Sequence, residues 1–84
     1  MNTNNFYQLI RRSQKLTMTG RSKSSNYNDE QIGLCVPPIS IGARSVAYIL
    51  SEVEEVIKAR IEGKAPEQIK DLVTHLIAQR KQPK

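Results

Sequence analysis

Residues 37–54 read PPISIGARSVAYILSEVE and carry the clearest structural signal in the chain. Two adjacent prolines cannot continue a helix and force an extended path into residues 39–41. The Gly-Ala-Arg segment that follows is turn-like, and residues 45–49 are rich in strand formers, so the stretch predicts a short β-hairpin. Ser51 with a glutamate three residues later is a capping box, which predicts that a helix begins there.

Two helices are predicted after the hairpin. Apolar residues recur at helical spacing from Val53 to Ile61, and Gly63 is expected to end this helix. Pro66 suits the first turn of the next helix, whose apolar residues fall on one face. These residues are Ile69, Leu72, Val73, Leu76 and Ile77. An isolated helix of this length is marginal in water, so we expect the stripe to be buried, against the preceding helix in preference to a homodimer. A frayed basic tail is expected from residue 81 onward.

Two shorter helices are predicted before the hairpin. Ser13 is suited to cap a helix through about Met18, which Gly20 would end. A polar turn then leads into a helix over residues 24–32, ended by Gly33. Two short helices joined by a tight turn form the helix-turn-helix pattern, and a hairpin after this pattern is a wing.

The predicted fold is therefore mostly α with a small β-hairpin, and it has two parts. Residues 1–63 are expected to form a winged helix-turn-helix domain. Residues 64–84 are expected to add a C-terminal amphipathic helix and the basic tail.

Length and composition exclude several classes of protein. A chain of 84 residues is one domain with a thin core and no room for a deep catalytic cleft, and no nucleophile is paired with a base. Cys35 is the only cysteine and His75 the only histidine, so neither a disulfide nor a four-ligand zinc site is expected. The longest strongly apolar run is far shorter than the roughly 20 residues that span a bilayer. We therefore expect a cytoplasmic protein that is not an enzyme and has no cofactor or metal.

The net charge of +5 is confined to one segment of the chain. Residues 1–28 hold five bases and no acid, whereas the eight bases and eight acids of residues 29–84 cancel. A patch of one sign attracts polyanions, chiefly nucleic acid or an anionic membrane. These bases do not lie opposite an apolar helical stripe, so double-stranded DNA is favoured over a membrane, and the protein is expected at the nucleoid.

The candidate DNA-binding residues lie in the first two helices, in the turn between them and in the wing. Bases and hydroxyls at the start of a helix can bind phosphates together with backbone amides. Asn28 is suited to pairing with adenine, and Tyr27 either faces base edges or joins the core. Arg44 at the hairpin tip can reach a phosphate or the minor groove. The full set is Arg11, Arg12, Lys15, Arg21, Ser22, Lys23, Ser24, Ser25, Tyr27, Asn28, Arg44 and Ser45.

Asn26 and Glu30 lie one turn apart on the second helix, so they share one of its faces. Burying an amide or a carboxylate without partners costs about 1 to 3 kcal/mol each. If that face meets the core, we expect this helix to shift its register onto Tyr27, Gln31 and Leu34, to become shorter, or to be ordered only on DNA.

A series of motifs runs through the chain: Thr19-Gly20, Ser22-Lys23-Ser24-Ser25, Tyr27, Gly33, Pro38, Ile39-Ser40-Ile41-Gly42-Ala43-Arg44-Ser45-Val46-Ala47 and Ser51-Glu52-Val53-Glu54. Together they resemble the AlpA-type phage transcriptional regulators over roughly residues 9–63, and the following helix extends the likeness to about Arg80. The resemblance implies a winged helix-turn-helix of the kind shared with excisionases and MerR-type regulators. It places the second helix in the major groove and the hairpin against the backbone. Asn26 and Glu30 stand where the family usually has apolar residues on the inner face of the second helix, so the resemblance implies that these two side chains face the core.

Three functions are consistent with these features. The leading one is a sequence-specific transcriptional regulator of a prophage or an integrated genetic element. The second is an excisionase, a recombination directionality factor that bends DNA beside an integrase. The third is a protein-interaction module that has lost DNA recognition.

Overall fold

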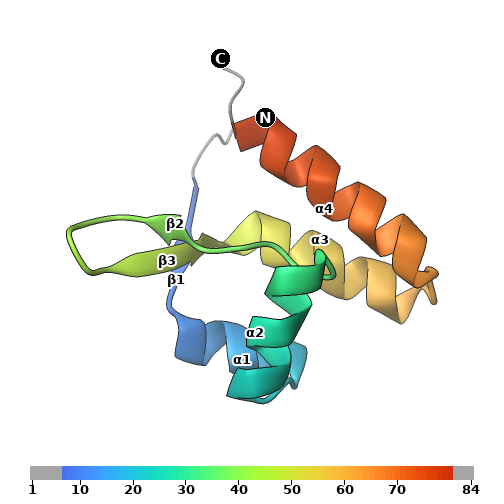
Figure 1. Cartoon of the computed structure of the whole chain (residues 1–84), viewed down its shortest axis with the longest axis horizontal. Helices are drawn as coiled ribbons and strands as arrows, with labels where there is room; N and C mark the ends of the chain where they lie inside the picture. Colours follow the sequence, from blue (N-terminus) through green and yellow to red (C-terminus); the bar gives the residue numbers. More distant parts are fainter. Residues whose placement is uncertain (1–6, 81–84) are drawn as a thin grey trace.

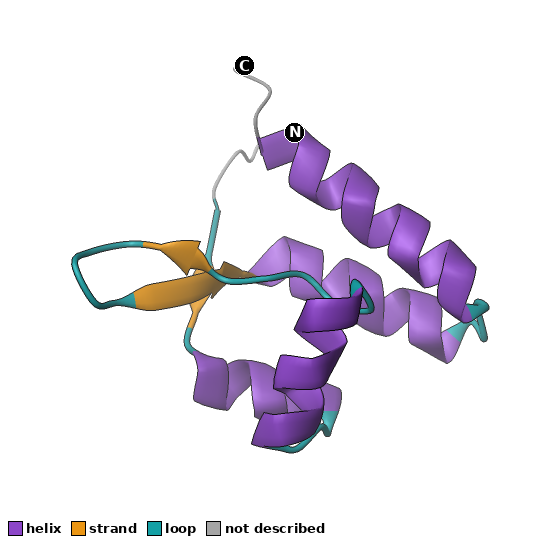
Figure 2. Ribbon diagram, viewed as in Figure 1, coloured by secondary structure: helices purple, strands orange, loops and turns teal. Residues whose placement is uncertain are grey.

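The computed structural model describes residues 7–80, which form four helices and three short strands (Figure 1). In chain order these are β1 (Leu9–Ile10), α1 (Arg12–Thr19), α2 (Lys23–Ile32), β2 (Ile39–Ser40), β3 (Val46–Ile49), α3 (Leu50–Ile61) and α4 (Pro66–Arg80). The arrangement confirms a winged helix-turn-helix with an added C-terminal helix. Figure 2 shows the wing projecting away from the helices, with α1 and α2 on one side of the sheet and α4 on the other. The predicted basic tail lies outside the described residues.

The sheet has the strand order β1–β3–β2, and both neighbouring pairs are antiparallel. β2 and β3 form the predicted hairpin, in which Ile39 pairs with Ala47. β1 was not predicted, and it pairs Ile10 with Tyr48. A strand of two residues is too short to show an alternating pattern, so only its long-range pairing reveals it. This third strand holds the start of α1 beside the base of the wing.

The helix-turn-helix has the predicted glycine stops but earlier helix starts. Gly20 (φ 73°) and Gly33 (φ 84°) adopt the left-handed conformation that ends α1 and α2. α1 begins at Arg12 and not after Ser13, because β1 leads directly into it. α2 begins at Lys23, and the Ser22 side chain accepts a hydrogen bond from a backbone N–H of its first turn.

The capping box predicted at Ser51 is wrong. β3 passes directly into α3, whose first residue is Leu50. The Leu50 N–H donates to the backbone carbonyl of Gln8 at 2.8 Å, so the β1 segment satisfies a donor that a side chain would otherwise cap. Glu52 in the first turn binds the guanidinium of Arg80 through both carboxylate oxygens.

The apolar core lies mainly between α3 and α4, which confirms the favoured packing of the C-terminal stripe. Ile69, Val73 and Leu76 are buried against α3 residues such as Val53 and Val56. The other two residues of the stripe, Leu72 and Ile77, are half-buried beside them. Because one chain buries this face, no homodimer is needed to cover it.

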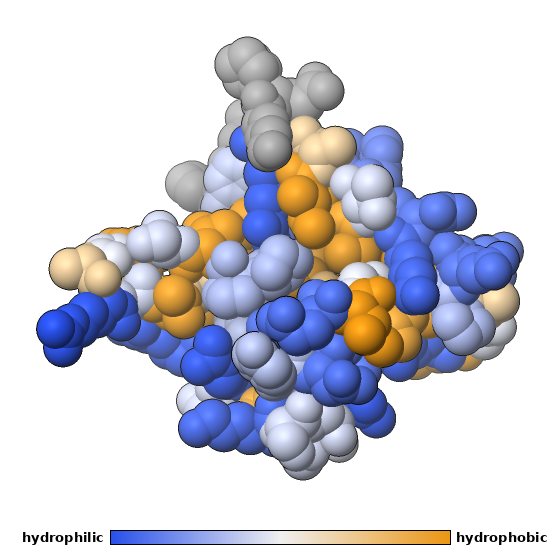
Figure 3. All heavy atoms as spheres, viewed as in Figure 1, coloured by the Kyte–Doolittle hydropathy of each residue, from blue (hydrophilic) through white to orange (hydrophobic). Residues whose placement is uncertain are grey.

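Two surfaces differ in character on the face shown in Figure 3. Hydrophilic residues cover most of the helix-turn-helix and share the wing tip with weakly hydrophobic ones, whereas strongly hydrophobic residues gather between the sheet and α4. Ile61 at the end of α3 departs from the predicted stripe, since it is 80% exposed. Within residues 7–80, no helix has the length and apolar character needed to cross a membrane.

Candidate nucleic-acid interface

α2 turns a polar face inward and a different polar face outward. Asn26 and Asp29 are buried, and the Glu30 side chain is only 7% exposed. The outward face is made of exposed residues: Lys23, Ser24, Tyr27, Asn28, Gln31 and Ile32. Tyr27 is 63% exposed, so it belongs to the surface and not to the core. The expected shift of register onto Tyr27 therefore does not occur.

The inward carboxylate of Glu30 is satisfied by three donors from three elements. Its Oε2 accepts hydrogen bonds from Lys15 Nζ at 2.9 Å, Asn26 Nδ2 at 3.0 Å and Tyr48 Oη at 2.6 Å. A buried polar group costs little when it is paired and hydrogen-bonded. This network explains why α2 keeps Asn26 and Glu30 inside without changing its register.

Lys15 was predicted to contact DNA, and the structure corrects this prediction. Its side chain is 1% exposed, with Nζ 4.2 Å from the centre of the Tyr48 ring. Besides Glu30, Nζ donates to the Val36 carbonyl and to Cys35 Sγ, each at 3.1 Å. The charge that was assigned to phosphate binding instead neutralises an acid inside the protein.

Asp29, the second acid of α2, is also neutralised from within. Arg21 donates to it through Nε (2.9 Å) and Nη2 (3.2 Å), and Arg60 of α3 approaches to 3.8 Å. Arg60 also donates to the Leu34 carbonyl at 3.0 Å, which fixes α3 to the end of α2. Since Asp29 and Glu30 are the only acids of α2, its outward face carries Lys23 and no negative charge.

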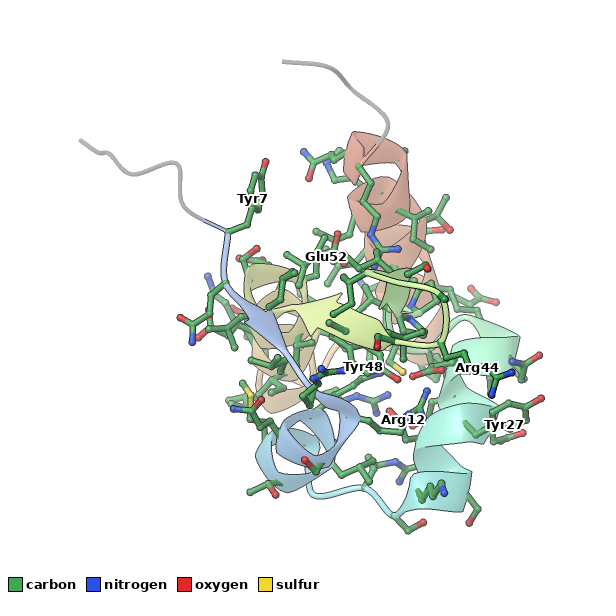
Figure 4. The ribbon with its side chains drawn as sticks, turned by 90° about the vertical axis from the view of Figure 1, so that its left-hand side faces the viewer. Tyr7, Arg12, Tyr27, Arg44, Tyr48 and Glu52 are labelled. Carbon is green, nitrogen blue, oxygen red and sulfur yellow. The ribbon has the colours of Figure 1, made fainter. Side chains whose placement is uncertain are left out.

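Two arginines at the start of α1 lie beside the wing. Arg11 Nη1 donates to the Val46 carbonyl at 3.2 Å, and Arg12 Nε donates to Tyr48 Oη at 3.3 Å. The hydrogen bond with Tyr48 raises the pKa of Arg12, with a smaller contribution from the charge of Glu30. In Figure 4, Arg12 lies between α1 and α2. It lines a surface hollow whose other residues are Ser22, Lys23, Ser24, Asn26, Tyr27 and Glu30.

The wing tip presents Arg44 to solvent. The loop is closed by a hydrogen bond from the Ile41 N–H to the Ser45 carbonyl at 2.9 Å, and Ser40 Oγ donates to the Gly42 carbonyl at 3.1 Å. Gly42 does not adopt a positive φ, so the turn does not depend on a glycine there. Arg44 is exposed, and Figure 4 shows it pointing toward the side of the molecule that carries α2. Ser45 is half-buried at the base of this loop.

Residues 8–61 match the family model described as prophage CP4-57 regulatory protein (AlpA). The match covers more than half of the chain and includes the helix-turn-helix, the wing and α3. The chain belongs to the AlpA family. No curated protein and no solved structure gives a significant match. The resemblance stated from the sequence is thus confirmed, and the chain is a prophage regulatory protein.

Five of the twelve predicted site residues of this AlpA-family protein line one hollow: Arg12, Ser22, Lys23, Ser24 and Tyr27. Arg11 and Asn28 are exposed but do not line it. Ser25 is half-buried, and its N–H serves the cap. Gln31 was missed, because the proposed change of register placed it inward. Its spacing of four residues from Tyr27 and three from Asn28 puts it on their face.

Cys35 and His75 have no place in this interface. Burial raises the pKa of the Cys35 thiol, against a smaller opposing effect of the hydrogen bond from Lys15. A buried, protonated thiol is a poor nucleophile, so Cys35 is best described as part of the core. His75 is exposed on α4, and residues 7–80 contain no cluster of three or more metal-ligating side chains.

Proposed function

We propose that this AlpA-family protein is a sequence-specific DNA-binding transcriptional regulator of a prophage or an integrated genetic element. In this proposal α2 enters the major groove, and the wing lies against the adjacent backbone. One observation carries the proposal most directly. Both acids of α2 are held in ion pairs inside the protein, so the face offered to DNA has hydrogen-bonding side chains and a lysine but no carboxylate to repel phosphate.

The outward face of α2 divides into positioning and reading groups. Lys23 and Ser24 lie at the helix start, where side chains and free backbone amides favour phosphate. Tyr27, Asn28 and Gln31 lie further along the helix. Asn and Gln present the donor and acceptor pair that matches adenine in the major groove. We assign base contacts to Asn28 and Gln31, and phosphate contacts to the helix start and the wing.

The bases available to phosphate are Arg11, Arg12, Lys23 and Arg44, since Lys15 is buried and Arg21 is paired with Asp29. Each phosphate contact contributes close to −0.9 to the slope of log K against log salt. We therefore expect a slope of roughly −3 to −4. A slope shallower than about −2 would show that these residues are not the DNA footprint.

A gel shift and footprint on DNA flanking the gene of this protein would test the proposal. One short protected site over a promoter is the expected result. Protection repeated beside an attachment site would instead identify an excisionase that acts with an integrase, and no protection at low salt would leave only the interaction module. Lys23→Gln should weaken binding on all sequences, whereas Lys64→Gln, an exposed lysine beyond α3, is the matched control and should bind as wild type.

A further inference from the structure

Tyr48 is buried at the centre of a short hydrogen-bonded chain that reaches the surface. Its side chain is fully buried on β3, the strand that also forms one side of the wing. The Tyr48 hydroxyl donates a hydrogen bond to Glu30 Oε2 of α2 at 2.6 Å. The hydroxyl oxygen accepts a hydrogen bond from Nε of Arg12 at 3.3 Å. One phenol therefore connects α1, α2 and the wing (Figure 4).

The direction of these two hydrogen bonds is fixed by chemistry. A tyrosine hydroxyl has one hydrogen to donate, and arginine has no acceptor atom. Because the Glu30 carboxylate takes the hydroxyl hydrogen, the oxygen lone pairs remain free for Arg12. A hydroxyl without that carboxylate is free to rotate its hydrogen toward the guanidinium, where it would repel the arginine.

Arg12 is held at one end only. Its Nε is used by Tyr48, and no protein partner within residues 7–80 is found for its two terminal nitrogens. The guanidinium lines the hollow that contains Lys23 and Ser24 from the start of α2. The Glu30 carboxylate also lines this hollow, but it is paired with Lys15. A free arginine side chain loses rotamer entropy when it binds a ligand. The bond to Tyr48 removes part of that freedom before any ligand arrives.

We propose that Tyr48 is a positioning residue for DNA binding, which orients Arg12 so that its two terminal nitrogens meet a backbone phosphate at the start of α2. Glu30 acts in the same chain by setting the direction of the Tyr48 hydroxyl. This inference rests on the proposed function. It adds to that function a buried residue that touches no DNA and yet sets the affinity for it.

A double-mutant cycle tests the proposal, with binding followed by fluorescence anisotropy on the operator fragment found by footprinting. Tyr48→Phe removes only the hydroxyl, and Arg12→Gln removes the guanidinium. Tyr48→Phe alone should weaken binding roughly threefold to tenfold, in line with the loss of one hydrogen bond. In the Arg12→Gln background the same change should have no further effect on affinity. Tyr7→Phe, on an 81% exposed tyrosine, is the matched control and should bind as wild type.

The outcomes separate this inference from the proposed function. Equal losses from Tyr48→Phe in both backgrounds would show a purely structural role and overturn the inference while leaving DNA binding intact. A wild-type chain that binds no DNA would refute the proposed function itself. Arg12→Lys gives an independent test that leaves the core untouched, since lysine keeps the charge but lacks Nε. It should weaken binding about as much as Tyr48→Phe, and wild-type affinity in Arg12→Lys would also overturn the inference.

Discussion

Lys15→Met tests whether a buried ion pair holds the helix-turn-helix together. Methionine has a similar length and keeps the apolar contact over the Tyr48 ring, but it removes the charge that faces Glu30. The two side chains of this pair are 1% and 7% exposed, so water cannot replace the missing partner. Breaking a buried pair by removing one member costs about 3 to 5 kcal/mol.

That loss is large relative to the stability of so small a chain. At roughly 0.05 to 0.15 kcal/mol per residue, the 84 residues give a free energy of unfolding of about 4 to 13 kcal/mol. For a domain of this size, 1 kcal/mol corresponds to a change in melting temperature of about 4 to 8 °C. Lys15→Met should therefore lower the melting temperature by more than about 10 °C.

Urea unfolding followed by circular dichroism measures the effect, with Lys23→Met on the exposed face of α2 as the matched control. The control should stay within about 0.5 kcal/mol of wild type. The double variant Lys15→Met with Glu30→Met removes both charges, so it should be destabilised by less than the two single variants together. If Lys15→Met leaves stability unchanged and only flattens the salt dependence of DNA binding, Lys15 is a phosphate contact and does not hold the helix-turn-helix together.

Three further predictions concern the core, the thiol and the division of labour in binding. Ile69→Ala, at a buried position of α4, should lower the free energy of unfolding in urea by about 2 to 5 kcal/mol. Ile61→Ala, at an exposed position, should change this free energy little. Equal effects would contradict the packing of α4 on α3. Cys35 should react with a thiol reagent at pH 8 only as fast as the protein unfolds, because its side chain is buried, and burial also raises the pKa of the thiol. Rapid labelling of the folded chain would show that the thiol is accessible. Arg44→Ala should weaken binding to operator and unrelated DNA by similar factors. Asn28→Ala should weaken binding to the operator alone, by about 1 to 3 kcal/mol. Equal losses of specificity from the two variants would refute the assignment of base contacts to Asn28 and phosphate contacts to Arg44.

Local sequence patterns were sufficient to predict the elements whose signals are local. Pro37 and the strand formers after it predicted the hairpin, the glycines at 20 and 33 predicted the ends of α1 and α2, and the spacing of the apolar residues predicted α4. β1 was missed, because its two residues acquire meaning only when they pair with β3. The start of α3 was misplaced for the same reason, since the donor to be capped is satisfied by Gln8, more than forty residues earlier in the chain.

The charges of the candidate site could also not be assigned from local sequence, because their partners lie far away in the chain. A count of charges in residues 1–28 identified a basic segment, but it could not separate bases that face solvent from bases that face buried acids. Lys15 lies in that segment and pairs with Glu30, fifteen residues later. One feature of the sequence could have revealed that Lys15 is buried. Asn26 and Glu30 lie on an inward face, and a buried carboxylate requires a hydrogen-bond donor nearby. A lysine on the facing side of α1 meets that requirement.

The helix that we assign to the DNA groove is joined to α1, α3 and the wing through its two acids. Glu30 is bound by Lys15 of α1 and by Tyr48 of the wing, and Asp29 is bound by Arg21 of the turn and approached by Arg60 of α3. Charge-assisted hydrogen bonds, such as the pair from Arg21 to Asp29, add geometric specificity to a contact. The same two acids that fix the orientation of α2 are thereby removed from its outer surface. The same contacts of Asp29 and Glu30 thus orient α2 and keep negative charge off its outer face. A substitution that frees either carboxylate should therefore disturb the orientation of α2 and also increase its repulsion toward phosphate.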